Sequence, residues 1–379
     1  MRAKGRDWKS VLAELHKMKS GDAKYENGAI LTSMCTSPYP GAKKAHKLFL
    51  DANLGDSSIF PATRQLEKQV VHTLSELLHC PKKTGFIVSG GTEANLLALL
   101  SARNIANLEK PEVVIPESGH FSFTKICNLL QVKTVQVPLD KSFRVNISSM
   151  ERSINKNTIA IVGTAGTAEL GAVDPVVKLS DIAHAHGVWL HVDAAFGGLV
   201  IPFLDEASRD ALTFDFKLTG VNSITVDPHK MGMATIPAGG ILFREPKLLE
   251  SIKTEAPYLS DTWQYTFVGT RSGASVASAW AAFETLGANG YRHVVKRCMK
   301  LTKRLADGVE SLSFELVTQP TLNILAFRCT DSKQLQEKMR ERGWFVSRVP
   351  RLNCLRIVVM PHLKPRHVEA FLKDLEQLA

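Results

Sequence analysis

Two short stretches of this chain carry side chains whose types and spacing suit catalysis. In the first, an apolar, β-branched run at 223–226 ends in Asp227 and Pro228, and His229 and Lys230 follow directly. The run predicts a buried strand, and the proline forces the chain out of it. Lys230 is therefore expected just beyond a strand end, where α/β folds bind their ligands. There it can serve as a Schiff-base nucleophile, and a solvated loop lysine is the alternative.

The second stretch, residues 188–198, predicts another buried strand that ends in Asp193, with only alanine and glycine residues close behind the carboxylate apart from Phe196. A carboxylate in such surroundings can meet a flat cationic ring edge-on. Pyridoxal phosphate needs two groups of these kinds, a lysine for its aldehyde and an acid for its ring nitrogen. Lys230 and Asp193 meet both requirements.

The two motifs, His-Val-Asp-Ala-Ala at 191–195 and Asp-Pro-His-Lys at 227–230, occur together at a characteristic spacing. In this they resemble the group II, fold-type I pyridoxal-phosphate-dependent decarboxylases of amino acids, and within them the archaeal L-aspartate/L-tyrosine decarboxylase family. The resemblance extends from about Gly55 to Met360. It implies a fold-type I transferase-like α/β architecture and a homodimer with active sites at the interface.

A phosphate site is expected upstream of this pair. Ser-Gly-Gly-Thr-Glu-Ala-Asn at 89–95 follows a predicted strand at 85–88 and opens a helix. Small residues let the backbone approach a phosphate, and the free N–H groups of a helix start can hold it. The resemblance puts Gly91 and Thr92 at the phosphate. It also implies that His120 stacks on the pyridine ring, and a turn or helix-cap histidine is the alternative.

The resemblance implies further contacts around the cofactor, from Ala195, Asp227 and His229. Relatives commonly carry two consecutive threonines, the second of which contacts the ring hydroxyl. Here Thr167 is followed by Ala168. Either Thr167 serves instead or this contact is missing.

Two residues are expected to act on the substrate. Weak periodicity over 251–273 predicts an exposed loop, and the resemblance implies that it closes over an active site, often the partner's, with Tyr258 as its catalytic tyrosine. A surface aromatic is the alternative, and Tyr265 is the rival candidate. Arg356 interrupts the apolar strand predicted at 354–360. A buried arginine needs a carboxylate partner, either an internal acid or, as the resemblance implies, the substrate's α-carboxylate.

Composition bounds the remaining possibilities. The chain has 379 residues, 44% hydrophobic and 22% charged, enough for a large core and two domains. No apolar run reaches the roughly 18 residues of a membrane span, and no secretory signal is expected in residues 1–20. Six cysteines without metal spacing suit a reducing cytoplasm and predict no metal site.

The net charge of +10 has two interpretations, a basic face for nucleic acid or an attraction for anionic cofactors and substrates. Lysines and arginines are spread along the chain, and no zinc-finger or RNP-like motif occurs. We therefore expect no nucleic-acid partner.

The predicted elements must bring these residues together. Strands alternate with helices from residue 86 to 244, which favours a mostly parallel sheet covered by helices, with 239–243 as an antiparallel member. Three parts are predicted: an N-terminal arm and substrate-side segment (1–50), a large cofactor-binding domain (51–286) and a small C-terminal α/β domain (287–379). A helix within 1–20 is expected to pack on the body or on a partner chain.

These expectations describe a cytoplasmic, homodimeric pyridoxal-phosphate enzyme that decarboxylates an L-amino acid. Lys230, Asp193, His120 and Tyr258 are its expected catalytic residues. The preferred substrate is L-aspartate, giving β-alanine for coenzyme A; L-tyrosine, giving tyramine for methanofuran, and L-glutamate are alternatives. A carbon–carbon lyase of a phosphorylated amino alcohol and a basic binding protein without cofactor belong to other classes.

Overall fold

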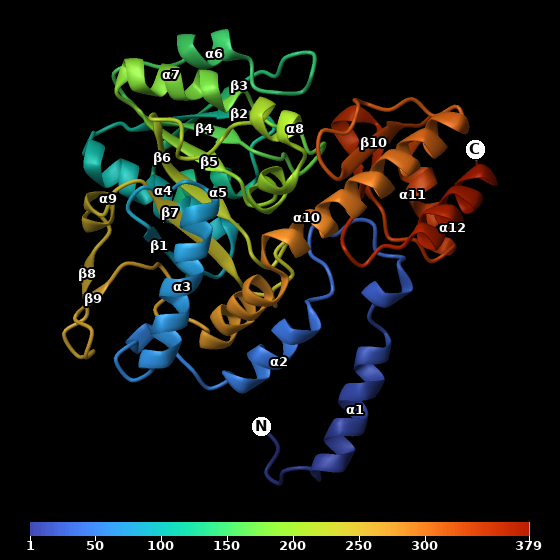
Figure 1. The fold of residues 1–379 in the computed structure, drawn as a ribbon, viewed down its shortest axis with the longest axis horizontal. Coiled ribbons are helices and arrows are strands. Elements are labelled where there is room, and N and C mark those ends of the chain that lie inside the picture. Colours follow the sequence, from blue (N-terminus) through green and yellow to red (C-terminus); the bar gives the residue numbers. More distant parts are fainter. Residues whose placement is uncertain (379) are drawn as a thin grey trace.

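The computed structural model describes residues 1–378, and a seven-stranded sheet lies at its centre (Figure 1). The strand order is β1-β7-β6-β5-β4-β2-β3. β7 runs antiparallel to both of its neighbours and the other pairs are parallel, which confirms the predicted sheet and its antiparallel member. The strands are β1 Thr84–Val88, β2 Glu112–Pro116, β3 Lys133–Val137, β4 Thr158–Thr164, β5 Trp189–Asp193, β6 Val221–Val226 and β7 Gly239–Phe243.

Helices cover both faces of this sheet, so its inner strands β2, β4, β5 and β7 are buried throughout, while the edge strands β1 and β3 are partly exposed. Alternate residues of one strand enter different cores: Ile161 of β4 joins one cluster, while Ala160 and Val162 join the other. The helices of this domain are α3 Pro61–Leu77, α4 Gly91–Ala106, α5 Ser122–Leu130, α6 Ile147–Arg152, α7 Val176–His186, α8 Glu206–Ala211 and α9 Lys247–Glu250. Of these, α4 is the helix expected after the turn at 89–95.

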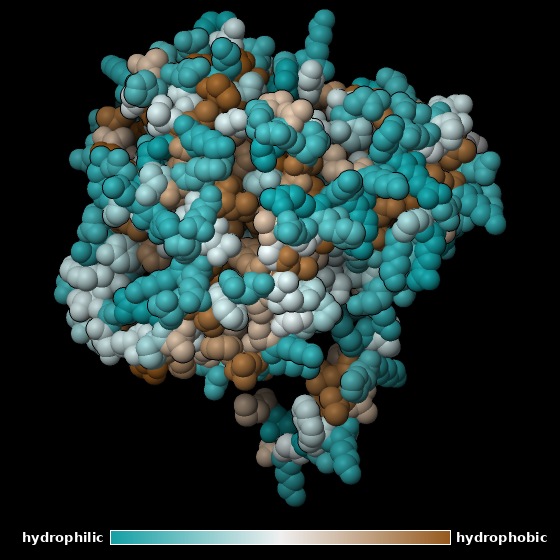
Figure 2. Space-filling view, in the orientation of Figure 1, coloured by the Kyte–Doolittle hydropathy of each residue, from teal (hydrophilic) through white to brown (hydrophobic). Residues whose placement is uncertain are grey.

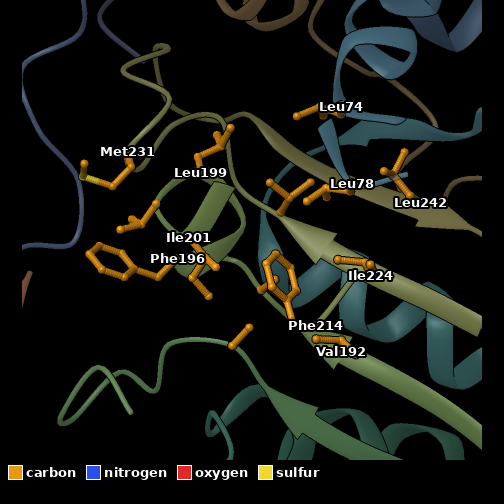
Figure 3. Packing of buried hydrophobic residues seen from close by; sticks show 14 of the residues in the cluster. Leu74, Leu78, Val192, Phe196, Leu199, Ile201, Phe214, Ile224, Met231 and Leu242 are labelled. Carbon is orange, nitrogen blue, oxygen red and sulfur yellow. The ribbon is translucent and has the colours of Figure 1, made fainter. Parts of the chain in front are cut away.

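One of the two cores holds the backbone that carries the expected catalytic residues Asp193 and Lys230. Figure 3 shows Val192 of β5 and Ile224 of β6 in the same cluster as Met231. Val192 directly precedes Asp193, and Met231 directly follows Lys230; both apolar side chains are fully buried. Close packing leaves such side chains little freedom, so the backbone on which Asp193 and Lys230 stand is held in place.

The C-terminal part forms the predicted small α/β domain. Its antiparallel sheet has the order β10-β12-β11, with β10 Ile324–Arg328, β11 Ser347–Val349 and β12 Cys354–Val358. Helices α11 Ser332–Glu341 and α12 Pro365–Glu376 accompany it. The long α10, Gly273–Ser311, joins both domains and is kinked at Gly287, whose φ of 55° is non-helical. The expected domain boundary, between 286 and 287, falls at this kink.

The N-terminal segment makes contacts with both domains. Leu31 belongs to the small domain's core, and Ile30 pairs with Phe345 of that domain. The short helix α2, Pro40–Leu48, which the sequence analysis did not predict, packs against α10. These contacts hold in place the N-terminal segment that leads to the active site.

Helix α1, Trp8–Ser20, projects away from the body and buries none of its residues (Figure 1). Packing on the body of its own chain, one of the two expected arrangements, is therefore wrong. Apolar groups remain on the surface of this arm, as the brown atoms in Figure 2 show. Its exposed apolar side chains share one stripe: Trp8, Leu12, Leu15 and Met18.

The stretch 251–273 is mostly irregular and exposed, as predicted, with one small addition. A two-stranded ribbon forms within it, β8 Thr254–Glu255 and β9 Trp263–Gln264. Within residues 1–378, no helix has the length and apolar character needed to cross a membrane.

Candidate active site

A cavity of about 330 Å³ opens at the carboxyl ends of the parallel strands. This is the edge where parallel sheets bind ligands, because successive strands deliver their following loops to the same side. In the register of the sheet, Asp193 stands opposite Thr164 of β4 and Thr225 of β6. The expected residues that line the cavity are Gly91, Thr92, His120, Asp193, Ala195, Asp227, His229 and Lys230.

Lys230 is held at the cavity by Asp227. Its Nζ lies 3.2 Å from Oδ2 of Asp227, and only 2% of the Asp227 side chain is exposed. The same oxygen accepts the backbone N–H of Gly91 at 3.2 Å, while the buried Oδ1 has no hydrogen-bond partner among the described residues. Asp227 thus ties the lysine to the start of α4, and it has one acceptor oxygen to spare.

Asp193 is held by two donors. Its Oδ1 accepts the N–H of Ala195 at 3.1 Å, and its Oδ2 accepts Nδ2–H of Asn95 at 3.0 Å. Both carboxylate oxygens therefore act as acceptors, and the two donors fix the orientation of the group. An ionised acid at this place can keep a heterocyclic nitrogen protonated.

The turn between β1 and α4 presents helix N–H groups to the cavity. A Cβ on Gly91 would stand 3.1 Å from Oδ2 of Asp227, so glycine lets the turn approach this carboxylate closely. Glu93 in the first turn of α4 accepts the N–H of Ser89 at 2.8 Å and that of Val268 at 3.0 Å. The Glu93 carboxylate therefore fixes the turn that is expected to hold a phosphate. It also connects this turn to the loop that carries Tyr258.

Both cavity histidines are neutral groups. Burial lowers the pKa of His120, and burial also lowers that of His229 despite the nearby Asp227. Nδ1 of His120 lies 2.9 Å from Oγ of Ser122, which fixes the ring. A neutral, oriented imidazole is suited to lie against a flat aromatic ring.

Three expected residues are not brought to the cavity. Thr167 is buried, but its hydroxyl accepts the N–H of Ala172 at 3.1 Å, and Ala168 lines the cavity instead. Tyr258 is 85% exposed and does not line the cavity within this chain. Arg356 lies outside it as well.

Tyr265, the rival loop tyrosine, is turned away too. Its ring stacks on Phe86 with the centroids 5.6 Å apart. It lines a larger cavity of about 720 Å³ that contains none of the expected cofactor contacts. Arg271 borders the same cavity and pairs with Glu67.

Arg356 is 9% exposed and yet forms no ion pair with a carboxylate of residues 1–378. Its Nη1 donates to the carbonyl of Thr32 at 2.9 Å and to Oγ of Ser347 at 3.4 Å, and its Nε has no partner. Burial lowers its pKa to about 10. Met34, two residues beyond Thr32, lines the cavity, so this unpaired cation sits beside the segment that borders the site.

Several lining residues were missed by the sequence reasoning. Asn95 carried a readable signal, because an amide within the apolar stretch of α4 needs a buried partner. Ser89 and Gly90 lie in the turn that the sequence analysis identified, although neither was given a contact there. The others gave no signal: Met34, Ser118, Thr164, Gly166, Phe196 and Ile236.

Comparison with known proteins decides the family. Residues 50–330 match the family model described as the pyridoxal-dependent decarboxylase conserved domain. The chain belongs to this family. Its cofactor is therefore pyridoxal phosphate, and the resemblance read from the sequence is confirmed.

Curated relatives of the decarboxylase span nearly its whole length. It is 48% identical to the probable L-tyrosine/L-aspartate decarboxylase of Methanothermobacter thermautotrophicus over 93% of this chain and 98% of the relative. It is 46% identical to the L-aspartate/L-glutamate decarboxylase of Pyrococcus horikoshii (97% and 96%) and 46% identical to the L-aspartate decarboxylase of Thermococcus kodakarensis (99% and 98%).

Solved structures confirm the fold. The sphingosine-1-phosphate lyase of Burkholderia pseudomallei superposes with a TM-score of 0.92 at 26% identity, covering 100% of this chain and 91% of that one. The glutamate decarboxylase of Lactobacillus brevis gives 0.90 at 23% identity, covering 100% and 93%.

The side chains of the decarboxylase fit the cofactor. Ser118 and Thr164 line the cavity with buried hydroxyls that have no partner among the described residues, and Asp227 has its free oxygen. Such groups are costly to bury alone, and a polar ligand satisfies them. When bound, the cofactor draws electrons away from the α-carbon of an amino acid. Lys230 would hold its aldehyde, Asp193 its ring nitrogen, and Gly91 and Thr92 its phosphate.

Proposed function

We propose that this decarboxylase converts L-aspartate to β-alanine, which serves coenzyme A synthesis in the cytoplasm. The observation that carries the proposal is the near full-length similarity to three decarboxylases whose names all include aspartate. Tyrosine and glutamate each occur in one of those names and are the alternative substrates. The carbon–carbon lyase is less similar, at 26% identity, so a decarboxylase is favoured.

Arg356 is assigned to the substrate's α-carboxylate. It is buried, it has no acid partner within residues 1–378, and its hydrogen bond to Thr32 connects it to the segment that borders the cavity. A carboxylate arriving there would form a charge-assisted pair that repays the cost of burying the guanidinium.

The remaining residues hold or move protons. Asp193 would hold the proton of the cofactor's ring nitrogen, and Lys230 would hold its aldehyde before the substrate amine binds. The phenol of Tyr258 is assigned to proton delivery at the α-carbon after carbon dioxide has left, and it must come within hydrogen-bond reach to do so. His120 lies against the ring.

A homodimer with shared active sites completes the proposal. Two exposed features support it: the apolar stripe of α1 and the loop that carries Tyr258, which is 85% exposed within its own chain. A second copy of the chain would cover the apolar stripe of α1 and would accept the loop that carries Tyr258.

A substrate panel tests the proposed function. The purified enzyme, loaded with pyridoxal phosphate, is offered L-aspartate, L-tyrosine and L-glutamate, and carbon dioxide and amine are measured together. We expect the highest kcat/KM for L-aspartate. A higher kcat/KM for L-tyrosine or L-glutamate would make that amino acid the substrate in place of L-aspartate. If none of the three releases carbon dioxide, the assignment is rejected.

A further inference from the structure

Behind Asp193 lies a buried row of polar side chains that the cofactor contacts do not explain. Trp189 and His191 come from β5, Ser223 from β6 and Asn95 from α4, and each is at most 7% exposed. The contacts join Nε1 of Trp189 to Oγ of Ser223 (2.9 Å), and that oxygen to Nδ1 of His191 (2.8 Å). They continue from Nε2 of His191 to Oδ1 of Asn95 (3.0 Å) and from Nδ2 of Asn95 to Oδ2 of Asp193 (3.0 Å). We call Trp189, Ser223, His191 and Asn95 the relay.

The two ends of the relay give its hydrogen bonds a direction. At one end Asn95 donates to the Asp193 carboxylate, so its Oδ1 faces Nε2 of His191 as an acceptor. At the other end an indole N–H can only donate, so Ser223 accepts from Trp189 and has its own proton free for Nδ1 of His191. Burial lowers the pKa of His191 to about 4, so the ring is neutral. With Nδ1 as acceptor, the single ring proton is on Nε2 and is donated to Asn95.

The same logic fixes the amide of Asn95. Its Oδ1 accepts from His191 and also from the hydroxyl of Thr225 at 2.7 Å. A flipped amide would set its NH₂ group against the Nε2–H of His191 and its oxygen against the carboxylate of Asp193. The relay therefore delivers an N–H, and only an N–H, to Asp193.

A branch leads from Asn95 to the other residue expected at the ring. Nδ2 of Asn95 lies 3.3 Å from Oγ of Ser122, which in turn lies 2.9 Å from Nδ1 of His120. The backbone N–H of Ser122 also donates to this Nδ1, at 3.3 Å. Nδ1 is thus an acceptor, and the proton of neutral His120 is on Nε2. One amide orients both residues that are expected to meet the cofactor ring.

We propose that Asn95 is a positioning residue through which the buried relay keeps Asp193 ionised, so that the cofactor's ring nitrogen retains its proton. A hydrogen bond donated to a carboxylate lowers its basicity. Without the Asn95 amide, Asp193 is the stronger base, and the proton that it shares with the ring nitrogen moves to the carboxylate. The proton changes place and no other bond is made or broken, but a neutral ring is a weaker electron acceptor.

The test uses the full chain loaded with pyridoxal phosphate labelled with ¹⁵N at the ring nitrogen. The ¹⁵N signal, recorded against pH without any amino acid, reports the ring proton directly and does not depend on the substrate assignment. In Asn95→Ala we expect the ¹⁵N shift at neutral pH to move towards that of a neutral ring, because the ratio of ring-protonated to carboxylate-protonated pairs should fall about ten- to a hundredfold, the effect of one hydrogen bond to a charged group. Turnover should fall with it.

Two further variants separate this role from a structural one. Ser223→Ala cuts the relay two bonds away from Asp193 and should lower the same ratio by a smaller factor. Ser101→Ala is the matched control, since this buried serine of the same helix α4 donates to the carbonyl of Leu248 at 2.6 Å and does not touch the relay. It should lower stability without changing the ratio.

Each outcome decides the matter. An unchanged ring-protonated fraction in Asn95→Ala, with the cofactor bound, would overturn the proposal even if activity fell. If Asn95→Ala does not fold or bind cofactor, an unchanged ring-protonated fraction in Ser223→Ala would overturn it, and a lowered fraction there would support it.

Discussion

Replacing Arg356 by methionine should have opposite effects on stability and on catalysis. The guanidinium is 9% exposed, has no carboxylate partner among residues 1–378, and has its pKa lowered by burial to about 10 from a usual value above 12. A lowered pKa of a base means that folding disfavours its charged form, so the charge destabilises the empty enzyme at neutral pH.

The magnitudes follow from these contacts. Arg356→Met removes the cost of burying the charged guanidinium, which favours the folded state. It also removes the hydrogen bonds to Thr32 and Ser347, each worth about 1 kcal/mol, which disfavours the folded state. We expect the net effect to be a stabilisation of the unliganded enzyme by about 1 kcal/mol. Losing the partner of a desolvated carboxylate costs about 2–5 kcal/mol, which lowers kcat/KM by roughly 30-fold or more for every amino acid.

The assay pairs urea denaturation of the enzyme without substrate with kcat/KM for aspartate, tyrosine and glutamate. Arg348→Met is the matched control, because it removes the same charge from β11, beside β12, at a half-buried position. It should leave substrate use unchanged. Normal kcat/KM in Arg356→Met together with a large loss of stability would refute the assignment and point to a purely structural arginine.

Three other substitutions test the site and the assembly. Lys230→Ala should abolish turnover and the borohydride-reducible chromophore, and a stable reduced adduct at another lysine would show that the assignment is wrong. Tyr258→Phe keeps the ring and deletes the phenolic proton, so carbon dioxide release should survive in part while amine formation falls much further; equal, undiminished yields would shift attention to Tyr265→Phe. Leu15→Glu places a charge on the exposed stripe of α1, where Leu15 is 50% exposed, and should weaken the dimer in sedimentation experiments without unfolding the monomer; an unchanged dissociation constant would exclude α1 from the interface.

Much of the site could be predicted from the sequence because strand ends are local features. A β-branched run that stops at a proline fixes where a strand ends, and the ends of neighbouring parallel strands meet at one edge of the sheet. Asp193 and Lys230 were therefore placed together before any contact was known. A Gly-Gly-Thr turn is commonplace by itself, and the turn that opens α4 became informative because it lies upstream of Asp193 and Lys230.

The direction of individual side chains was decided only by the tertiary structure. Thr167 and Ala168 are neighbours in the sequence, but Gly166 has a φ of 101°, and in the resulting turn Thr167 bonds to Ala172 while Ala168 faces the cavity. Likewise, the absence of an acid beside Arg356 depends on the packing of a whole domain around it.

The relay shows most clearly which features depend on the sequence and which depend on the tertiary structure. His191, Asn95 and Ser223 come from separate elements, and no spacing in the sequence predicts that they touch. Local patterns record which residues are buried and where elements begin and end, since these depend on neighbours along the chain. Which buried polar groups satisfy one another depends on how the elements pack, because a hydrogen bond requires its two atoms to lie within about 3 Å. The sequence alone therefore determined the chemistry at the strand ends, and the fold decided how its protons are held.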